Sequence, residues 1–519
     1  MTKKYSDYMD EISGTILYDR LLSFGVFSKN LPPIFDSRSF AELCQKQNPG
    51  FKYQEYDYVR FDTMRSNNTT RELGIPAPMA YEKLCAVLKK HWEKIQEHFH
   101  AQTDSQDYII SRIHLQLRSN EESLFLMTYD DWRNGGSPKD DLPIGMRYIV
   151  EADISNCFQS IYTHSIPWAL IGKEEAKKNK GKEKKWYNKI DDACQKLKYK
   201  ETHGILTGPH AFNLISELIL TVVDNELYEK GWRYIRHIDD FMCFVESEEK
   251  AEVFLRELSG VLRKYDLHLN HKKICIRKLP CSSATEWVRK LNEFKLITTY
   301  GEVGYKQVAD FFSLAIELMR DNKENSAILN YAIQILSGQS LSDNAKRYCW
   351  KIGMQLCLIY PYLFPLMDTY IFSNCKPPID AIRMFTNKAF DDGCMNENYE
   401  ECCYAILFSL KYGFEIQHIS DFCVNINNVN TNISDFKKVD NCLYKLFVLL
   451  YYKKRQEKEK LDEIYQHALD LREYDMDRNW LFIYETLEEN DLNGDWKKLK
   501  HAKVSFLKSD FQYGVNLKR

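Results

Sequence analysis

The strongest constraint on the fold comes from the segment RYIRHIDDFMCF, residues 233–244, with Asp239 and Asp240 at its centre. Apolar and polar residues alternate on both sides of this acidic pair, which predicts two short strands joined by a turn. The turn would hold two carboxylates side by side, where they can bind a hard divalent cation. Most isolated Asp-Asp pairs are solvated surface charges, so this interpretation requires a third carboxylate and a nucleotide-sized pocket elsewhere in the chain.

A third carboxylate follows a second strand pattern. The segment MRYIVEADI, residues 146–154, is apolar and β-prone and brings Asp153 to the end of a buried strand. Mg²⁺ prefers oxygen ligands in octahedral geometry. Asp153 and Asp239 could together hold two such ions, which would clamp the attacking and leaving oxygens of a phosphoryl transfer. The two aspartates lie 86 residues apart, so only the fold can bring them together.

A glycine loop lies between the two acidic sites. In GILTGPHAFN, residues 204–213, Gly204 and Gly208 bracket a tight loop, and residues 212–227 then have helical spacing. Such a loop lets the backbone approach a base or template, and a helix N-terminus favours anions. An ordinary turn has the same composition. The order of strand-Asp, glycine loop with helix, and Asp-Asp hairpin is therefore more specific than any of its parts.

The aromatic residue Phe158 follows Asp153 by five positions. If Asp153 binds the metal, this ring could lie under the sugar of an incoming nucleotide. It would then clash with a 2′-hydroxyl and favour deoxyribose. The alternative is a core residue, because aromatic side chains that follow strands usually pack inside.

This order of motifs is that of a polymerase palm, and the residues resemble those of reverse transcriptases. ADISNCFQSI is similar to their first palm motif, GILTGPHAFNLI to the loop-and-helix motif, and HIDD to their Tyr-x-Asp-Asp box. LHLNHKKICI resembles the next motif, whose lysine, here Lys273, lies near the nucleotide phosphates. Upstream, TTRELGIPAPMAY resembles the fingers motif that contributes an arginine to the triphosphate, here Arg71. Arg65 is a second candidate for that surface.

A subgroup resembles the chain more specifically: the bacterial abortive-infection and unknown-group reverse transcriptases used against phage. YDRLLSFGVFSKNLPPIF, IPAPMAYEKLC, SIYTHSIPWAL and GPHAFNLISELIL are all similar to that subgroup, and the resemblance covers residues 15–290 in motif detail. It implies dNTP substrates and Mg²⁺, with Mn²⁺ as an alternative cofactor. Members of the subgroup can synthesise DNA without a copied template, and some prime on a protein tyrosine. The expected partners therefore include a DNA product attached through a tyrosine, a non-coding RNA and further copies of the chain.

The resemblance also implies roles for individual residues. The catalytic residues would be Asp153, Asp239 and Asp240. The metal site would comprise the same three aspartates and Ile154. The nucleotide-binding residues would be Phe158, Arg71, Lys273, Gly208, Thr207 and Arg65.

Two departures from the reverse-transcriptase pattern affect the expected activity. His237 stands where the acidic box normally begins with Tyr, and Thr207 replaces the Gln that usually precedes the second glycine of the loop. That Gln position helps to align the templating pair or the nucleotide, so its loss puts ordinary templated copying in doubt. We interpret His237 as a structural, partly buried imidazole in preference to a catalytic base.

Length and periodicity predict an α+β fold in two parts. A chain of 519 residues should hold two or more domains. We expect right-hand polymerase fingers and palm over residues 1–290. From about Gly301, helical patterns begin with Val308–Met319 and continue to the end, with almost no strand signals. This pattern predicts an all-α helical array over residues 291–519. The resemblance implies that this array is HEAT-like and stands in place of a thumb.

Composition limits the remaining function classes. The 71 basic and 74 acidic residues nearly balance, so any nucleic-acid surface must be local. The charged segment 173–189 is either a solvated insertion or a lysine arm near phosphates. The fifteen cysteines include no CxxC pair and are expected to be reduced and buried. The N-terminus lacks a signal-peptide core and no stretch is long enough to span a bilayer, so we expect a cytoplasmic protein. The resemblance implies that its source is bacterial.

The sequence therefore favours an antiphage-defence, reverse transcriptase-like DNA polymerase that uses two metal ions and dNTPs, with template-independent and protein-primed synthesis as expected features. Two alternatives remain open at this point. The same fold could synthesise RNA, although Phe158 argues against it. The chain could also be a scaffold with a vestigial polymerase core, whose helical part binds a phage or host component.

Overall fold

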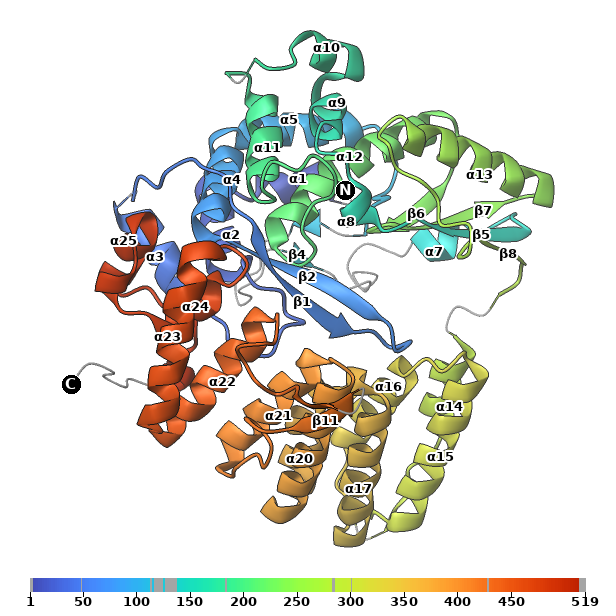
Figure 1. Cartoon of the computed structure of the whole chain (residues 1–519). Coiled ribbons are helices and arrows are strands. Elements are labelled where there is room, and N and C mark those ends of the chain that lie inside the picture. Colours follow the sequence, from blue (N-terminus) through green and yellow to red (C-terminus); the bar gives the residue numbers. More distant parts are fainter. Residues whose placement is uncertain are drawn as a thin grey trace.

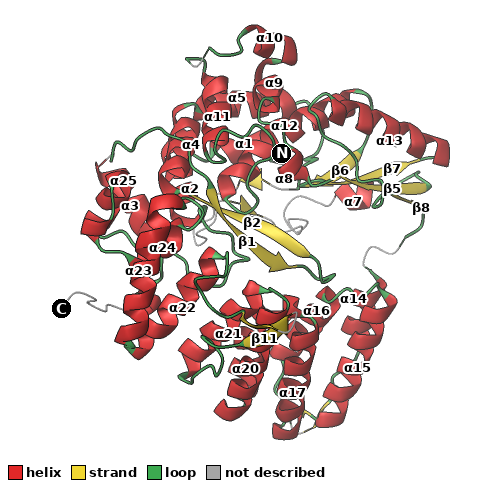
Figure 2. Cartoon of the chain, in the orientation of Figure 1, coloured by secondary structure: helices red, strands yellow, loops and turns green. Residues whose placement is uncertain are grey.

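The computed structural model describes residues 3–47, 49–112, 114–115, 125–126, 138–182, 184–281, 285–299, 301–426 and 429–512. A mixed α/β region is followed by a mostly helical region, as the sequence predicts (Figures 1 and 2). One continuous hydrophobic core extends through both, from Tyr5 to Leu507. The division at residue 290 stays a prediction.

The mixed region contains these elements: α1 Tyr5–Asp10, α2 Gly14–Phe24, α3 Arg38–Gln47, β1 Tyr58–Met64, β2 Thr70–Pro76, α4 Pro78–Lys90, α5 Trp92–Thr103, β3 His114–Leu115, β4 Phe125–Leu126, α7 Pro138–Asp141, β5 Tyr148–Asp153, α8 Cys157–Ser160, α9 Ser165–Ile171, α10 Lys173–Lys178, α11 Trp186–Lys196, α12 His210–Glu229, β6 Tyr234–His237, β7 Asp240–Val245, α13 Glu248–Arg263, β8 Cys275–Lys278 and α14 Glu286–Glu293.

A four-stranded antiparallel sheet in the order β6-β7-β5-β8 forms the centre of this region. Helix α13 packs against β5 and β7, and α12 packs against α13. Helix α12 follows Pro209 and is buried on nearly all sides, so the rest of its domain encloses it. The predicted strand over residues 146–154, the predicted hairpin and the helix after the glycine loop are thus confirmed.

The helical region contains β9 Thr298–Thr299, β10 Glu302–Val303, α15 Tyr305–Asp321, α16 Ala327–Ser337, α17 Asp343–Ile359, η1 Pro361–Leu363, α18 Phe364–Leu366, the π-helix η2 Met367–Phe372, α19 Ser373–Cys375, α20 Ile379–Met395, α21 Tyr399–Tyr412, β11 Cys423–Ile426, β12 Val429–Asn432, α22 Cys442–Arg455, α23 Lys458–Tyr474, α24 Trp480–Thr486, η3 Glu489–Asp491, α25 Gly494–His501 and η4 Ser509–Phe511. The predicted helices are present. The expectation of an all-α region was wrong, because β9 pairs with β10 and β11 pairs with β12, each pair antiparallel.

The antiparallel β1–β2 hairpin lies between the two regions in Figure 1. The Met64 N–H donates to the Glu400 carboxylate of α21 at 2.6 Å. The N–H and hydroxyl of Ser326 donate to the Ser66 carbonyl at 2.7 and 2.8 Å. Burial raises the pKa of Glu400 to about 8. The helical region therefore holds both the strand and the tip of this hairpin.

The chain also closes on itself near its ends. Phe35 forms an antiparallel bridge with Leu507, and the Asp36 N–H donates to the Phe506 carbonyl at 2.9 Å.

All fifteen cysteines are free thiols and most are buried, as expected. No helix in the described part of the chain combines the length and the apolar character that a bilayer span requires.

Candidate active site

The central sheet brings two of the predicted aspartates into direct opposition. Asp153 is the last residue of β5, Asp240 is the first residue of β7, and the antiparallel register pairs them. Because side chains alternate along a strand, Asp153 and Glu151 point to the same face, as do Asp240 and Met242. Asp153 is only 4% exposed, whereas Asp240 is exposed.

The third aspartate lies in the turn between β6 and β7. His237 pairs with Asp240, so Ile238 and Asp239 make a two-residue turn, in which Ile238 has φ +55°. The Ile154 N–H donates to the Asp239 carbonyl at 3.1 Å. This bond places Asp239 beside the end of β5, so the fold brings together the three carboxylates that the sequence predicts.

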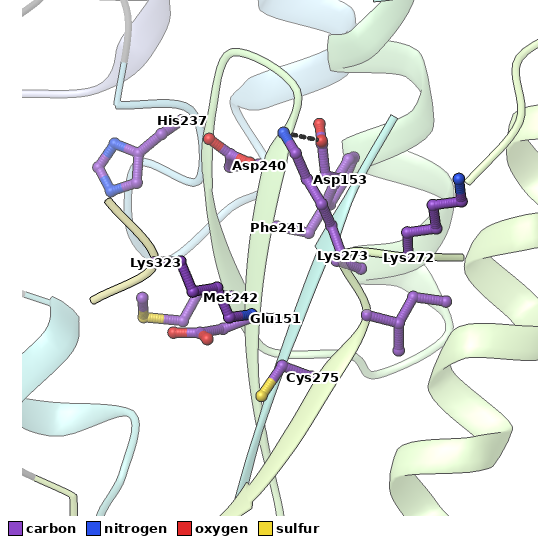
Figure 3. A pocket seen from close by; sticks show the side chains of 12 residues that line it. Glu151, Asp153, His237, Asp240, Phe241, Met242, Lys272, Lys273, Cys275 and Lys323 are labelled. Carbon is purple, nitrogen blue, oxygen red and sulfur yellow. Dashed lines mark ion pairs between the residues drawn. The ribbon is translucent and has the colours of Figure 1, made fainter. Parts of the chain in front are cut away.

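The three carboxylates repel one another. Burial, together with the charges of Asp153 and Asp240, raises the pKa of Asp239 to about 7. Burial and Asp153 also raise the pKa of Asp240, and Lys273 opposes that rise. The Lys273 ammonium forms an ion pair with Asp153, and this hydrogen bond raises the pKa of Lys273. Lys273, which the sequence predicts to lie near nucleotide phosphates, thus contacts a carboxylate in this structure (Figure 3).

The donor set suits a hard divalent cation. Asp153 Oδ1 is buried and makes no hydrogen bond with any described residue, although buried carboxylate oxygens normally have a partner. In this conformation, no three His, Cys, Asp or Glu side chains among the described residues gather closely enough to form a finished metal centre. Asp153, Asp239 and Asp240 would hold Mg²⁺ or Mn²⁺ once Lys273 left Asp153, and Ile154 would lie beside that site.

A cavity of about 630 Å³ opens beside Asp153 and Asp240. Figure 3 shows the side chains that surround it. Its lining comes from four strands and two loops and comprises Glu151, Ala152, Asp153, His237, Asp240, Phe241, Met242, Lys272, Lys273, Ile274, Cys275 and Lys323. Lys323 comes from the turn after α15 in the helical region, and sequence reasoning missed it. No pattern around a single lysine in an exposed turn could have identified it.

The predicted arginines lie at the end of the β1–β2 hairpin. Arg71 is on β2 and Arg65 follows β1. Partial desolvation and the charge of Arg65 lower the pKa of Arg71, and the charge of Asp239 raises it. Arg71 therefore lies within electrostatic reach of Asp239, whereas neither arginine lines the cavity.

The glycine loop contacts the β1–β2 hairpin. The Gly74 N–H donates to the Thr207 carbonyl at 2.9 Å, which ties β2 to the loop. Gly208 has φ +121° and Gly204 has φ +81°. A Cβ on Gly204 would lie 2.8 Å from the Gln159 carbonyl oxygen, so only glycine fits there.

Two further predicted residues take different positions. Phe158 is half-buried in α8, packs against the core and does not line the cavity. Its carbonyl accepts the Ile205 N–H at 2.8 Å, so α8 is bound to the glycine loop. His237 is buried and lines the cavity beside Asp240. Of the charged segment 173–189, no described lysine reaches the cavity.

Comparison with known families identifies the region that carries this site. Residues 79–295 match the family described as reverse transcriptase (RNA-dependent DNA polymerase). The chain contains a reverse transcriptase domain. This domain includes the three aspartates and Lys273, whereas Arg65, Arg71 and Lys323 lie outside the matched residues.

Comparison with individual proteins adds little to what the family match shows. No curated protein matches the chain. Among solved structures, apo telomerase from Candida tropicalis truncated from its C-terminal domain is 14% identical with a TM-score of 0.29, over 44% of this chain and 51% of that one. Telomerase from Candida albicans in complex with a TWJ fragment of telomeric RNA is 9% identical with a TM-score of 0.31, over 68% and 67% of the two chains. These scores are too low to support conclusions about this chain.

The raised pKa of Asp239 predicts how the stability of the reverse transcriptase domain changes with pH. A carboxyl whose pKa rises from 3.8 to about 7 on folding stabilises the fold fully below 3.8. That contribution is lost as pH rises through about 7. In EDTA, the melting temperature of the wild type should therefore fall between pH 5 and pH 8 more steeply than that of Asp239→Asn. Calorimetry measures both melting temperatures. If they change with pH in parallel for the wild type and Asp239→Asn, the raised pKa of Asp239 is contradicted.

Proposed function

We propose that the chain is a metal-dependent DNA polymerase that transfers deoxynucleotidyl groups at the site formed by Asp153, Asp239 and Asp240. The observation that carries this proposal is the cross-strand pairing of Asp153 with Asp240 beside the Asp239 turn. A divalent cation bound there would stabilise the negative charge that develops on the reacting phosphate.

In the proposed reaction a 3′-hydroxyl or a tyrosine hydroxyl attacks the α-phosphorus of a dNTP. The new P–O bond forms, the hydroxyl proton passes to solvent, and the bond to pyrophosphate breaks. Lys273 and Arg71 neutralise the triphosphate, and Gly208, Thr207 and Arg65 complete the nucleotide surface. Since the Lys273 ammonium now pairs with Asp153, it would have to transfer to a phosphate oxygen when the nucleotide binds.

Three lysines of the cavity support binding of a nucleic-acid backbone. Lys272 and Lys273 come from the loop before β8, and Lys323 comes from the helical region. Positive charges in a cavity beside the reacting centre attract phosphates, and this attraction weakens with salt. We propose that residues 291–519 act in place of a thumb and that Lys323 is their contribution to the bound strand.

Phe158 should control the choice of sugar. Phe158→Ala is expected to reduce the preference for dNTP over rNTP by ~10- to 100-fold, because the clash with a 2′-hydroxyl disappears. The measurement is the ratio of incorporation efficiencies for matched dNTP and rNTP. Phe294→Ala, which removes another half-buried ring, serves as the control. Equal use of both nucleotides by the wild type would instead favour RNA synthesis.

We further propose an antiphage role, with synthesis that needs no template and begins on a tyrosine of the protein. The support is the motif resemblance over residues 15–290, together with His237 and Thr207 in place of residues that templated copying normally uses. A non-coding RNA and further copies of the chain are proposed partners.

One experiment tests the polymerase proposal together with template use and tyrosine priming. The purified protein is given each labelled dNTP with Mg²⁺, with and without an RNA-primed template, and products are separated on denaturing gels before and after protease. Label that migrates with the protein until protease treatment supports tyrosine priming. Incorporation only on the template restricts the enzyme to copying, and no incorporation under any condition contradicts the proposed activity. Plaque counts on bacteria that express wild type or Asp239→Asn test the antiphage role.

A further inference from the structure

A buried arginine lies directly behind the aspartate turn. Arg236 of β6 is 0% exposed and is among the largest fully buried side chains of the described chain. Burying an unpaired guanidinium would cost several kcal/mol, so its partners must compensate for the lost hydration. Two carboxylates of α12 do so: Asp224 and Glu217, which are 1% and 3% exposed.

All five N–H donors of the Arg236 guanidinium have acceptors. Nε lies 3.0 Å from both oxygens of Asp224, and Nη2 lies 2.6 Å from Asp224 Oδ2 and 3.0 Å from Glu217 Oε2. Nη1 donates to Glu217 Oε1 at 2.8 Å and to the backbone carbonyl of Ile238 at 2.7 Å. Four donors thus fix the guanidinium to α12, and the fifth binds the turn.

Hydroxyl groups satisfy the remaining lone pairs of the two carboxylates. The Tyr234 hydroxyl donates to Asp224 at 2.8 Å, and the hydroxyls of Tyr5 and Ser111 donate to Glu217 at 3.1 and 2.9 Å. A buried ionic cluster with satisfied donors and acceptors is rigid, because any shift breaks several strong hydrogen bonds. Arg236 therefore offers the turn a fixed point anchored in the central helix.

The bond to Ile238 acts on the peptide immediately before Asp239. Ile238 has φ +55°, a left-handed conformation that is a genuine outlier for a β-branched residue. Such a conformation persists only where its surroundings enforce it. The carbonyl of Ile238 is held by Arg236, and the carbonyl of Asp239 is held by the Ile154 N–H at 3.1 Å. Both peptide planes that flank the carboxylate are thus fixed.

We propose that Arg236 is a positioning residue that holds the strained Ile238 turn and thereby aims the Asp239 carboxylate at the metal site. This inference rests on the proposed function and deepens it. Arg236 does not touch substrate or cation, because it is enclosed behind the hairpin. Its loss should weaken cation binding, and nucleotide selection should be unchanged.

The test uses Arg236→Lys in the full chain. Lysine keeps the positive charge, but the three N–H donors on its single nitrogen cannot replace the five donors of the guanidinium. Mn²⁺ binding, followed by the electron paramagnetic resonance signal of free Mn²⁺, should weaken about 10- to 100-fold, as for other residues that orient metal ligands. The Mg²⁺ concentration for half-maximal dNTP incorporation should rise in parallel, and the rate at saturating Mg²⁺ should largely recover.

Two further variants separate positioning from general stability. Tyr234→Phe removes a hydrogen bond to Asp224 and leaves every Arg236 donor paired, so it should lower the melting temperature without changing Mn²⁺ binding. Ile238→Gly combined with Arg236→Lys should restore much of the Mn²⁺ affinity, because glycine adopts positive φ without strain. If Arg236→Lys does not fold, Asp224→Asn loosens the guanidinium more gently and should shift Mn²⁺ binding in the same direction.

The outcomes distinguish this inference from the polymerase proposal. If Asp239→Asn itself leaves Mn²⁺ binding unchanged, the proposed metal site fails. If Asp239→Asn loses Mn²⁺ while folded Arg236→Lys and Asp224→Asn bind it with wild-type affinity, only the positioning role is overturned.

Discussion

Asp239→Asn should reduce dNTP incorporation by at least ~10³-fold, which corresponds to about 4 kcal/mol of lost transition-state stabilisation. The amide keeps the size of the side chain but removes the negative charge that a divalent cation requires. Initial rates of labelled dNTP incorporation at saturating Mg²⁺ measure the effect. Asp239 lies in the turn that Arg236 holds, and its carbonyl accepts the Ile154 N–H beside Asp153.

The matched control for this prediction is Glu201→Gln, which makes the same chemical change on an exposed loop. It should leave the rate unchanged, while circular dichroism confirms that both variants are folded. Asp240→Asn should have a smaller effect than Asp239→Asn, because Asp240 is the more exposed carboxylate of the two. Wild-type incorporation by folded Asp239→Asn would contradict the assignment of the active site.

Trp480→Ala should lower the free energy of unfolding by about 3–5 kcal/mol, the usual cost of deleting a buried aromatic side chain. Trp480 of α24 is 0% exposed. It stacks on Trp496, with ring centroids 5.5 Å apart, and makes an edge-to-face contact with Phe506, with ring centroids 5.0 Å apart. Its indole N–H donates to the Ile75 carbonyl of β2 at 3.4 Å. The helical region would therefore lose part of its hold on the β1–β2 hairpin, which carries Arg71.

Urea denaturation of the full chain measures this effect. Tyr474→Ala, an exposed aromatic of the same region, should change the free energy of unfolding by no more than ~0.5 kcal/mol. Because Trp480 contacts β2, fluorescence of the helical region and activity of the reverse transcriptase domain should be lost in one transition. A Trp480→Ala variant as stable as the wild type would show that this contact is energetically neutral.

Local patterns in the sequence account for most of the elements. Alternation around Asp239 and Asp240 predicts the β6–β7 hairpin, and helical spacing predicts α12 and α15, because both periodicities arise from neighbouring residues. The β11–β12 hairpin was missed although Cys423 to Asn432 alternates apolar and polar residues around an Asn-Asn pair. That signal is short and lies within a helical region.

The sequence predicted the acidic residues of the candidate site. It did not predict the residues around them, Arg236 and Lys323. Asp153, Asp239 and Lys273 belong to motifs with a recognisable order, so their proximity followed from the resemblance. Arg236 was overlooked because an arginine in an alternating strand normally faces solvent, and only the carboxylates of α12 make its burial tolerable. Lys323 carries no local signal, since its position depends on how the helical region packs near the four-stranded sheet.

The chain's sequence alone specifies which carboxylates are available and the two strands that present them, because strand alternation and turn chemistry act over a few residues. The tertiary structure decides that Asp153 lies beside Asp239 and Asp240, although 86 residues separate Asp153 from Asp239 in the sequence. It also decides that Arg236 binds the Ile238 carbonyl of the turn and that Lys323 lines the cavity. These features depend on burial and on contacts between distant segments, which exist only once the whole core has formed.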